Sequence, residues 1–444
     1  MTMKDLTRRQ FLRFGAGLGA AASAAGLAAC QGDGAGASSN DANSSDGTIE
    51  LTYWYCWTDL IKENNEERIQ EFNDTVGKEK GIHVTAESQG SYDDLNAKLK
   101  SAFVAGEAPD VCVMVINSTK VFADGGMIQP IDDVIATDDL NDFWPGLMDN
   151  CKVDGSLYGV PYLRSTPVLY YNKTLFQKAG LDATAAPATW DDMVKASDAL
   201  AAAGAKGYGF YSYNWALEAF AFCNGGTLWG DGILGEKATF ADQPAADMVR
   251  WFQDNVANHN FSFVAGSNAS DTLDSNAANQ QVGMWVSSTA DLTHARKLAE
   301  QGGYEVGVGF IPKHVQNKVP TGGCNLVMCG NIDGDRRAAA AELINFMTSK
   351  DAAVKNHLKT GYLLTRQSCA DDDRIKEAYA KIPEYQVALD QLKYAVGDCM
   401  NSGFDEASKI YTDAIEGLMN TTTDPSSALQ TAEDQASQIL SHNA

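Results

Sequence analysis

The sequence predicts an α/β protein of two lobes, each built on a doubly wound, mostly parallel sheet, with a helical region at the C-terminus. Its 444 residues are too many for one ordinary hydrophobic core, so two domains are expected. Short runs of β-branched and aromatic residues alternate with helical segments along most of the chain. The first of these form a βαβαβ succession, which is typical of a parallel sheet.

The first lobe is predicted from the segments that follow residue 48. Three strands and two intervening helices are expected at residues 50–57, 59–76, 82–86, 91–106 and 108–116. The second helix has clear end signals, because Ser91 and Asp94 have the spacing of a capping box and Gly106 is a C-terminal stop. A hairpin around Asp154 and Gly155 follows.

The second lobe is predicted to begin at the stretch RSTPVLYYNKTLFQKAG, residues 164–180. Its Thr166–Tyr171 portion is rich in strand formers, and a helix runs from Lys173 to the stop at Gly180. Thr189 caps the next helix, with Asp192 closing the box. Further strands are expected at residues 208–212, 282–287, 304–312 and 322–329, and the chain is mostly helical from residue 336, apart from 360–366.

The net charge of −24 excludes several classes of partner. A nucleic-acid-binding protein needs a cationic surface, and a chain this acidic is equally unsuited to lie on anionic lipid. No apolar run beyond residue 30 is long enough to cross a bilayer. The charge and the globular composition instead favour an exported, soluble body.

The N-terminus has the pattern of an export signal. A twin-arginine motif at Thr7–Arg13 precedes a mildly apolar stretch that ends in LAAC, and LAAC resembles a lipobox. We therefore expect residues 1–29 to be a twin-arginine lipoprotein signal peptide and Cys30 to be lipidated. Residues 30–47, with no apolar side chain larger than alanine after Cys30, are expected to be a flexible tether.

The other cysteines and the histidines offer no metal site. The six histidines lack the spacing of metal ligands, and no C-x-x-C pair is present, so no metal is expected. Export permits disulfides, but pairing cannot be read from a sequence, and buried thiols are the simpler interpretation for most of the eight. These eight are Cys56, Cys112, Cys151, Cys223, Cys324, Cys329, Cys369 and Cys399.

Motifs for catalysis are missing from the sequence, whereas residues suited to binding a polyol are frequent. There is no GxSxG elbow, no P-loop and no dinucleotide fingerprint after a strand, so neither enzymatic activity nor a cofactor is expected. Aromatic residues near strand ends, including Trp54, Trp57 and Trp215, could stack on a sugar ring, and nearby hydroxyls and backbone N–H groups could bind its hydroxyls.

The order of seven segments resembles the extracellular solute-binding proteins of bacterial ABC importers, the family that includes maltose- and glycerol-3-phosphate-binding proteins. The resemblance runs from about residue 48 to 366 and is closest to glycerol-3-phosphate, glycerophosphodiester and sugar binders. The segments are YWYCW, SYDDLNAKLKSAFVAGEAPDV, VDGSLYGVPY, STPVLYYNKTLFQKAGLD with PATWDDM, VGMWVSSTADL, TGGCNLV and KTGYLLTR.

This resemblance implies a two-lobed, periplasmic-binding-protein-like fold of type II that clamps a solute between its lobes. Lobe I would comprise residues 48–163 and 311–365, and lobe II residues 164–310 and 366–444. Trp215 would be a stacking platform. The ligand contacts implied by the matching motifs are Tyr92, Ser165, Ser288, Gly323 and Tyr362.

The chain departs from the family pattern at two places. The family pattern has an acidic residue just after the strand at 108–116. This chain has none there, and Asn117 in the same region could bind a hydroxyl instead. A phosphate-facing arginine of the C-terminal region has no clear equivalent, and Lys409 is the nearest basic residue. Arg164 could supply the missing charge, although a solvated loop arginine is the simpler interpretation. A phosphate ligand and a neutral sugar both stay open.

The resemblance also implies the partners and the location. The protein would be a monomer that hangs from the outer face of the cytoplasmic membrane by the lipid on Cys30 and delivers a small polar solute to a permease with cytoplasmic ATPase subunits. Two other functions stay open. One is a surface hydrolase of glycosides or phosphodiesters, which would need a converging acid pair or nucleophile; the other is an interaction lipoprotein without transport.

Overall fold

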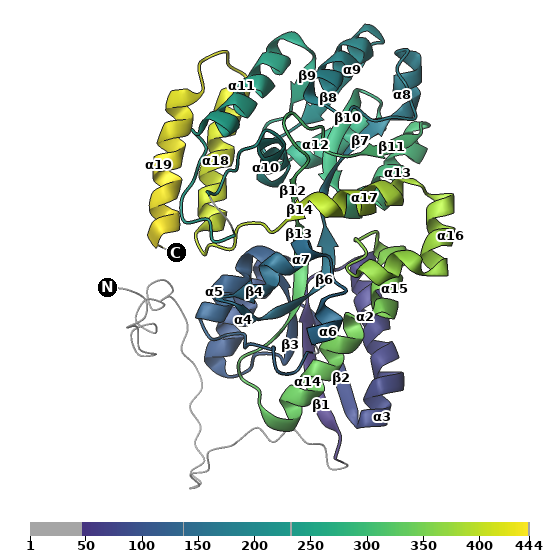
Figure 1. The fold of residues 1–444 in the computed structure, drawn as a ribbon, viewed down its shortest axis with the longest axis vertical. Coiled ribbons are helices and arrows are strands. Elements are labelled where there is room, and N and C mark those ends of the chain that lie inside the picture. Colours follow the sequence, from purple (N-terminus) through teal and green to yellow (C-terminus); the bar gives the residue numbers. More distant parts are fainter. Residues whose placement is uncertain (1–46, 136, 231–232, 443–444) are drawn as a thin grey trace, which may run out of the picture. The chain divides into compact units, whose positions relative to one another are not determined.

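The computed structural model describes residues 47–135, 137–230 and 233–442. The leader expected at residues 1–29, the lipidation site Cys30 and nearly all of the tether lie outside the described residues. The described chain contains two five-stranded sheets, each with its own helices, and two small two-stranded ribbons. We call each large sheet with its helices a lobe (Figure 1).

The first sheet has the strand order β2-β1-β3-β13-β6. Helices α2 and α14 pack on one of its faces through a core that includes Tyr53, while α4 and α5 pack on the other through Met114. Its strands are β1 (Ile49–Tyr55), β2 (Ile82–Ser88), β3 (Val111–Val115), β6 (Gly159–Ser165) and β13 (Gly322–Met328). Its helices are α2 (Leu60–Phe72), α3 (Lys78–Lys80), α4 (Tyr92–Ala105), α5 (Thr119–Asp124), α6 (Thr137–Leu140), α7 (Pro145–Met148), α14 (Gly334–Met347) and α15 (Lys350–Thr360).

The second sheet has the order β11-β7-β10-β8-β9. Its strands are β7 (Pro167–Asn172), β8 (Lys206–Phe210), β9 (Phe261–Phe263), β10 (Val282–Ser288) and β11 (Val306–Gly309). The helices that follow these strands are α8 (Lys173–Lys178), α9 (Trp190–Ala202), α10 (Asn214–Cys223), α11 (Gln243–Asn258), α12 (Ala269–Ala278) and α13 (Leu292–Gly302). The C-terminal helices are α16 (Asp373–Lys381), α17 (Glu384–Gln391), α18 (Phe404–Met419) and α19 (Ser426–His442).

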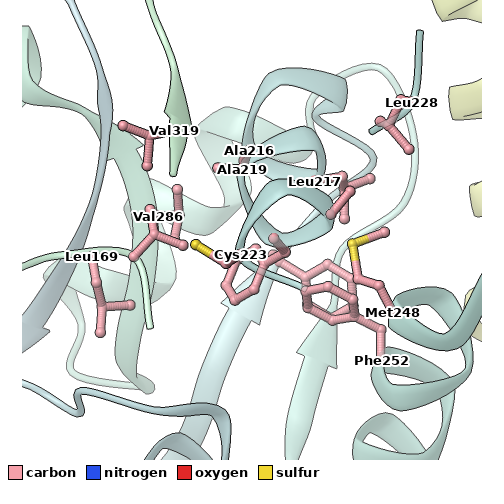
Figure 2. Packing of buried hydrophobic residues seen from close by; sticks show 14 of the residues in the cluster. Leu169, Ala216, Leu217, Ala219, Cys223, Leu228, Met248, Phe252, Val286 and Val319 are labelled. Atoms are coloured by element: carbon pink, nitrogen blue, oxygen red, sulfur yellow. The ribbon is translucent and has the colours of Figure 1, made fainter. Parts of the chain in front are cut away.

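Helices also cover both faces of the second sheet. One face packs through a large core in which α10 meets α11, and Figure 2 shows Leu217 of α10 near Met248 of α11 and Cys223 of α10 near Val286 of β10. The opposite face packs against α12 and α13 through Tyr170. Because each sheet has helices on both faces, both are doubly wound, as predicted.

The sheets are more mixed than the sequence predicts. Each sheet has two parallel and two antiparallel strand pairings. One reversed strand makes both antiparallel pairings, and this strand is β13 in the first sheet and β7 in the second. The reversal arises because these strands carry the chain from one sheet to the other. Only Thr166 separates β6 from β7, and Thr321 separates β13 from the ribbon strand β12 (Val319–Pro320), which pairs with β14 (Ala395–Val396).

Local signals in the sequence agree with the structure. Ser91 and Asp94 form a complete capping box on α4, and Thr189 accepts from the backbone of Asp192 at the start of α9. Strands β4 (Lys152–Val153) and β5 (Ser156–Leu157) form the predicted hairpin. The helix expected at 59–76 consists of α2 followed by a π-helical turn at Asn73–Gly77.

Two glycine substitutions should change stability in opposite directions. A Cβ on Gly207 of β8 would lie 2.2 Å from the Ser197 Cβ of α9, so Gly207→Ala should destabilise the fold by about 1–3 kcal/mol through overpacking. A Cβ on Gly417 of α18 would meet nothing within 4 Å, so Gly417→Ala should stabilise the fold by roughly 0.5–1 kcal/mol. Urea unfolding measures both changes, and an unaltered midpoint for Gly207→Ala would contradict this packing.

Candidate functional site

The predicted contact residues gather where the chain passes between the two sheets. Ser165 ends β6 and pairs with Gly322 of β13. A Cβ on Gly322 would lie 3.3 Å from Ser165 Oγ and 2.8 Å from Trp215 Cζ2, so Gly322 lies against both residues. The Trp215 indole also donates to the Thr321 carbonyl oxygen at 3.2 Å. Ser165 and Trp215, predicted from separate motifs, therefore belong to one surface shared by β6, β13 and α10.

Gly323 is required by the backbone at this point. Its φ is +91°, and a Cβ there would lie 2.1 Å from the Leu163 carbonyl oxygen. A side chain at position 323 would therefore both strain the backbone and push β13 away from β6. The Gly322–Gly323 pair lets the two crossing strands approach closely beside Ser165.

Tyr92, Trp57 and Tyr362 form the first lobe's share of this region. Trp57 and Tyr92 pack edge to face with ring centroids 5.7 Å apart. The buried Tyr92 hydroxyl has the Cys324 thiol as a neighbour. Burial raises the pKa of Tyr92 and of Tyr362, and the Cys324 thiol raises both further, so both phenols face Cys324 of β13.

Ser288 brings the second sheet to the same place. The loop after β10 meets the Tyr362 loop, because a Cβ on Gly361 would lie 3.2 Å from the Ala290 carbonyl oxygen. The Ser288 carbonyl accepts from the Tyr170 hydroxyl at 2.7 Å, and its Oγ accepts from the Ala290 amide at 3.1 Å. The Ser288 hydroxyl therefore also caps the 3₁₀ turn Thr289–Asp291.

Three of the predicted residues have hydrogen-bond partners within the protein. The Trp54 indole donates to Glu87 Oε2 at 2.9 Å, and alternation along β1 directs Trp54 to the face opposite Tyr53. Asn117 Nδ2 donates to the Cys399 carbonyl oxygen at 2.7 Å, which ties the first lobe to the segment after β14. The Lys409 side chain is 73 % exposed and binds Asp413 at 2.7 Å.

Arg164 is buried completely, so the interpretation as a solvated loop arginine is wrong. Its guanidinium makes four hydrogen bonds of 2.8–2.9 Å, all to neutral acceptors. Burial lowers its pKa. The guanidinium therefore joins β6 to β13 and to the end of α7, and these bonds occupy most of its donors. Its acceptors are the carbonyl oxygens of Gly322 and Leu147, Asn325 Oδ1 and Thr321 Oγ1.

Two buried carboxyls that sequence reasoning missed lie close to this junction. Glu218 of α10 is 2 % exposed and Asp398 is 5 % exposed, and their carboxyls lie within hydrogen-bonding reach of each other. Burial and the neighbouring Asp398 raise the pKa of Glu218. Burial raises the pKa of Asp398 to about 6. The single acidic residue in the otherwise apolar run WALEAFAFC is the signal that could have revealed Glu218.

The Asp398 segment is fastened to the first lobe by its backbone. Asn150 Nδ2 donates to the Asp398 carbonyl oxygen at 2.7 Å, and the Asp398 amide donates to Asn150 Oδ1 at 3.0 Å. The Gly397 amide donates to Asp149 Oδ2 at 2.8 Å. Glu218 therefore contacts, from the second lobe, a segment that the first lobe holds in place.

The described residues hold neither a cluster of metal ligands nor a helix that could span a membrane. Within residues 47–135, 137–230 and 233–442, no three histidine, cysteine or acidic side chains come together as metal ligands. No helix in the same ranges has the length and apolar character needed to cross a membrane. All eight cysteines after Cys30 are buried free thiols, and the Sγ atoms of Cys112 and Cys329 lie 3.9 Å apart.

Comparison with known sequences identifies relatives that cover most of the chain. The family described as bacterial extracellular solute-binding protein matches residues 67–384. The sn-glycerol-3-phosphate-binding periplasmic protein UgpB of Brucella melitensis is 27 % identical over 362 residues, which cover 77 % of this chain and 81 % of the relative. The UgpB of Escherichia coli is 25 % identical over 414 residues, with coverages of 88 % and 92 %.

Solved structures with the same fold support the architecture. The cyclic alpha-maltosyl-1,6-maltose binding protein of Arthrobacter globiformis superposes with a TM-score of 0.78 at 20 % identity, covering 89 % of this chain and 100 % of the other. Mycobacterium tuberculosis UgpB in complex with glycerophosphocholine gives 0.75 at 21 % identity, with coverages of 89 % and 99 %. At such low identities the similarity shows the fold alone, and it confirms the predicted two-lobed fold.

Replacing Glu218 by glutamine should make the protein more stable at alkaline pH. A carboxyl whose pKa is raised by folding stabilises the protein below its ordinary pKa of 4.5, and this stability is lost as the pH rises through the folded-state pKa. The glutamine side chain carries no charge and can donate to Asp398. We expect Glu218→Gln to gain about 1–3 kcal/mol at pH 8 and little at pH 4.5.

Urea unfolding at both pH values measures this effect. Glu300→Gln, at an exposed position of α13, is the control and should change little at either pH. A loss of stability in Glu218→Gln at pH 8 would show that the Glu218 carboxylate is favourable when charged.

Proposed function

This chain belongs to the bacterial extracellular solute-binding protein family, as seven of its segments predict, and we propose that it captures a sugar or a glycerol-phosphate-type solute for an ABC importer. The observation that carries the proposal is the cluster of polar and aromatic residues at the crossing between the sheets. Gly322 lies against both Ser165 and Trp215 there, and the Tyr362 loop meets the loop after β10. Such a surface suits a ligand with flat apolar faces and many hydroxyls.

The proposed mechanism is closure of the lobes on the solute. Residues 48–163 and 311–365 would move as one lobe, and residues 164–310 and 366–444 as the other, except that Arg164 and Ser165 end β6 of the first sheet and would move with it rather than with the second lobe. Thr166 and Thr321, the single residues beside the crossing strands, would absorb the change in backbone angles. The closed form would then present a surface to the permease.

We further propose how the protein is exported and attached to the membrane. The protein would be a monomer, exported and held at the outer face of the cytoplasmic membrane by a lipid on Cys30. Its partners would be the solute and the permease with its ATPase subunits. The export signal and LAAC in the sequence support this proposal.

A hydrolase is disfavoured by the geometry of the Glu218–Asp398 pair. The two carboxyls lie within hydrogen-bonding reach of each other, so no substrate fits between them. Glycosidase carboxyls flank a substrate and stand roughly 5 Å or more apart. We therefore propose that this protein binds its solute without converting it chemically.

Solute binding can be followed by tryptophan fluorescence. The mature protein should show saturable binding to at least one member of a panel of glycerol-3-phosphate, glycerophosphocholine and maltose-type sugars, with no product. Ser165→Ala and Trp215→Ala should each weaken binding by roughly 1–3 kcal/mol, because each removes a hydrogen bond or a stacking surface.

Lys381→Ala is the control, because Lys381 is exposed and pairs with the exposed Glu377. Formation of product would refute the transport proposal. Saturable binding that neither Ser165→Ala nor Trp215→Ala weakens would place the solute elsewhere.

A further inference from the structure

His357, in the last turn of α15, is a buried histidine that contacts the Tyr362 loop of the candidate site. It is 2 % exposed, and its Nδ1 lies 2.6 Å from the Tyr362 carbonyl oxygen. A carbonyl oxygen only accepts hydrogen bonds, so Nδ1 carries the proton and donates it. Burial lowers the pKa of His357 to about 4, so the ring is neutral at pH 7 and its Nε2 carries no proton.

The backbone around Tyr362 is held by hydrogen bonds rather than by regular structure. Residues 361–365 belong to no helix or strand. The Tyr362 amide donates to Thr360 Oγ1 at 3.3 Å, and the Leu363 amide donates to the Arg164 carbonyl oxygen at 2.8 Å. The bond from His357 is the shortest of these three, so His357 fixes the peptide group that follows the Tyr362 side chain.

The imidazole also packs against two tyrosines of the C-terminal helices. The rings of Tyr385 in α17 and Tyr379 in α16 lie edge to face with it, at centroid distances of 4.8 and 5.5 Å. Tyr385 belongs to the core on the α12 and α13 face of the second sheet, and its neighbour Glu384 pairs with Lys173 of α8 at 2.8 Å. His357 therefore connects the Tyr362 loop to the second lobe.

Filling space does not explain a histidine at this position. Its Nε2 is buried and has no hydrogen-bond partner in the part of the chain that the structure describes. A buried polar atom without a partner is costly, and an apolar side chain of similar size would avoid that cost. What the imidazole gains in return is the hydrogen bond to the Tyr362 carbonyl oxygen.

We propose that His357 is a positioning residue of the solute site, which sets the place of Tyr362 relative to the second lobe. This inference rests on the proposed function, in which Tyr362 contacts the solute. Because His357 is almost fully buried, it would act through Tyr362 rather than touch the solute. A binding side chain needs a position fixed to within about 0.5 Å, and the bond to its carbonyl supplies part of that restraint.

Two substitutions separate this hydrogen bond from the packing. The side-chain amide of asparagine lies where Nδ1 lies in histidine and can still donate to the Tyr362 carbonyl oxygen, whereas glutamine carries its amide farther out, near Nε2. Both lose the ring contacts with Tyr379 and Tyr385. His357→Asn should therefore bind solute within about threefold of the wild type, and His357→Gln about tenfold more weakly. Fluorescence titration with maltotriose, glycerophosphocholine and glycerol-3-phosphate measures both.

Hydrogen exchange provides a measurement that needs no solute. The Leu363 amide should exchange about tenfold faster in His357→Gln than in the wild type, because the loop opens more often, and His357→Asn should stay close to the wild type. His83→Gln is the matched control, because His83 is an exposed histidine of β2 that pairs with Glu50. It should change neither binding nor exchange.

Two results would overturn the inference. Equal losses of affinity in His357→Asn and His357→Gln would show that His357 acts through packing alone. Unchanged affinity and unchanged Leu363 exchange in His357→Gln would show that the bond does not position the loop. A wild type that binds none of the three solutes nor a wider panel would refute the proposed function instead, and the exchange comparison would still decide whether His357 holds the Tyr362 loop.

Discussion

The buried guanidinium of Arg164 holds together the part of the molecule on which the site depends. It bonds to Gly322 and Asn325 of β13, to Thr321 before that strand and to Leu147 at α7. A charge taken fully out of water is tolerated only when its donors are satisfied, and here neutral oxygens do so. Because Ser165 and Gly322 flank this network, the position of the predicted contacts follows from it.

A second network of buried groups joins the lobes through the segment after β14. Asn150 and Asp149 fix the backbone of Gly397 and Asp398, and the Asp398 carboxyl meets Glu218 of α10. Two carboxyls so close cannot both ionise without repulsion, so the pair retains a proton into the range where ordinary carboxyls have lost theirs. Protonation of the Glu218–Asp398 pair and the contact that this pair makes between the lobes are therefore linked.

Sequence reasoning predicted what is encoded locally. The capping box at Ser91, the Thr189 side-chain cap and the Asp154–Gly155 hairpin involve neighbours only, and all are present. The seven ordered segments were also enough for the family and the fold. What could not be predicted are contacts between distant residues: Arg164 finds acceptors 17, 157, 158 and 161 positions away, and Glu218 meets Asp398. The available signal for such contacts was a single charged residue in an apolar run, as for Glu218, or at a strand end, as for Arg164.

Unfolding of Arg164→Lys tests the central claim most directly. Lysine keeps the charge but cannot reproduce the forked bonds, so several acceptors would be left unpaired. The free energy of unfolding should fall by about 3 kcal/mol or more, whereas Arg250→Lys, at a partly exposed ion pair, should change it by less than about 1 kcal/mol. Wild-type stability combined with lost solute binding would contradict the account, because Arg164 would then serve the ligand rather than the junction.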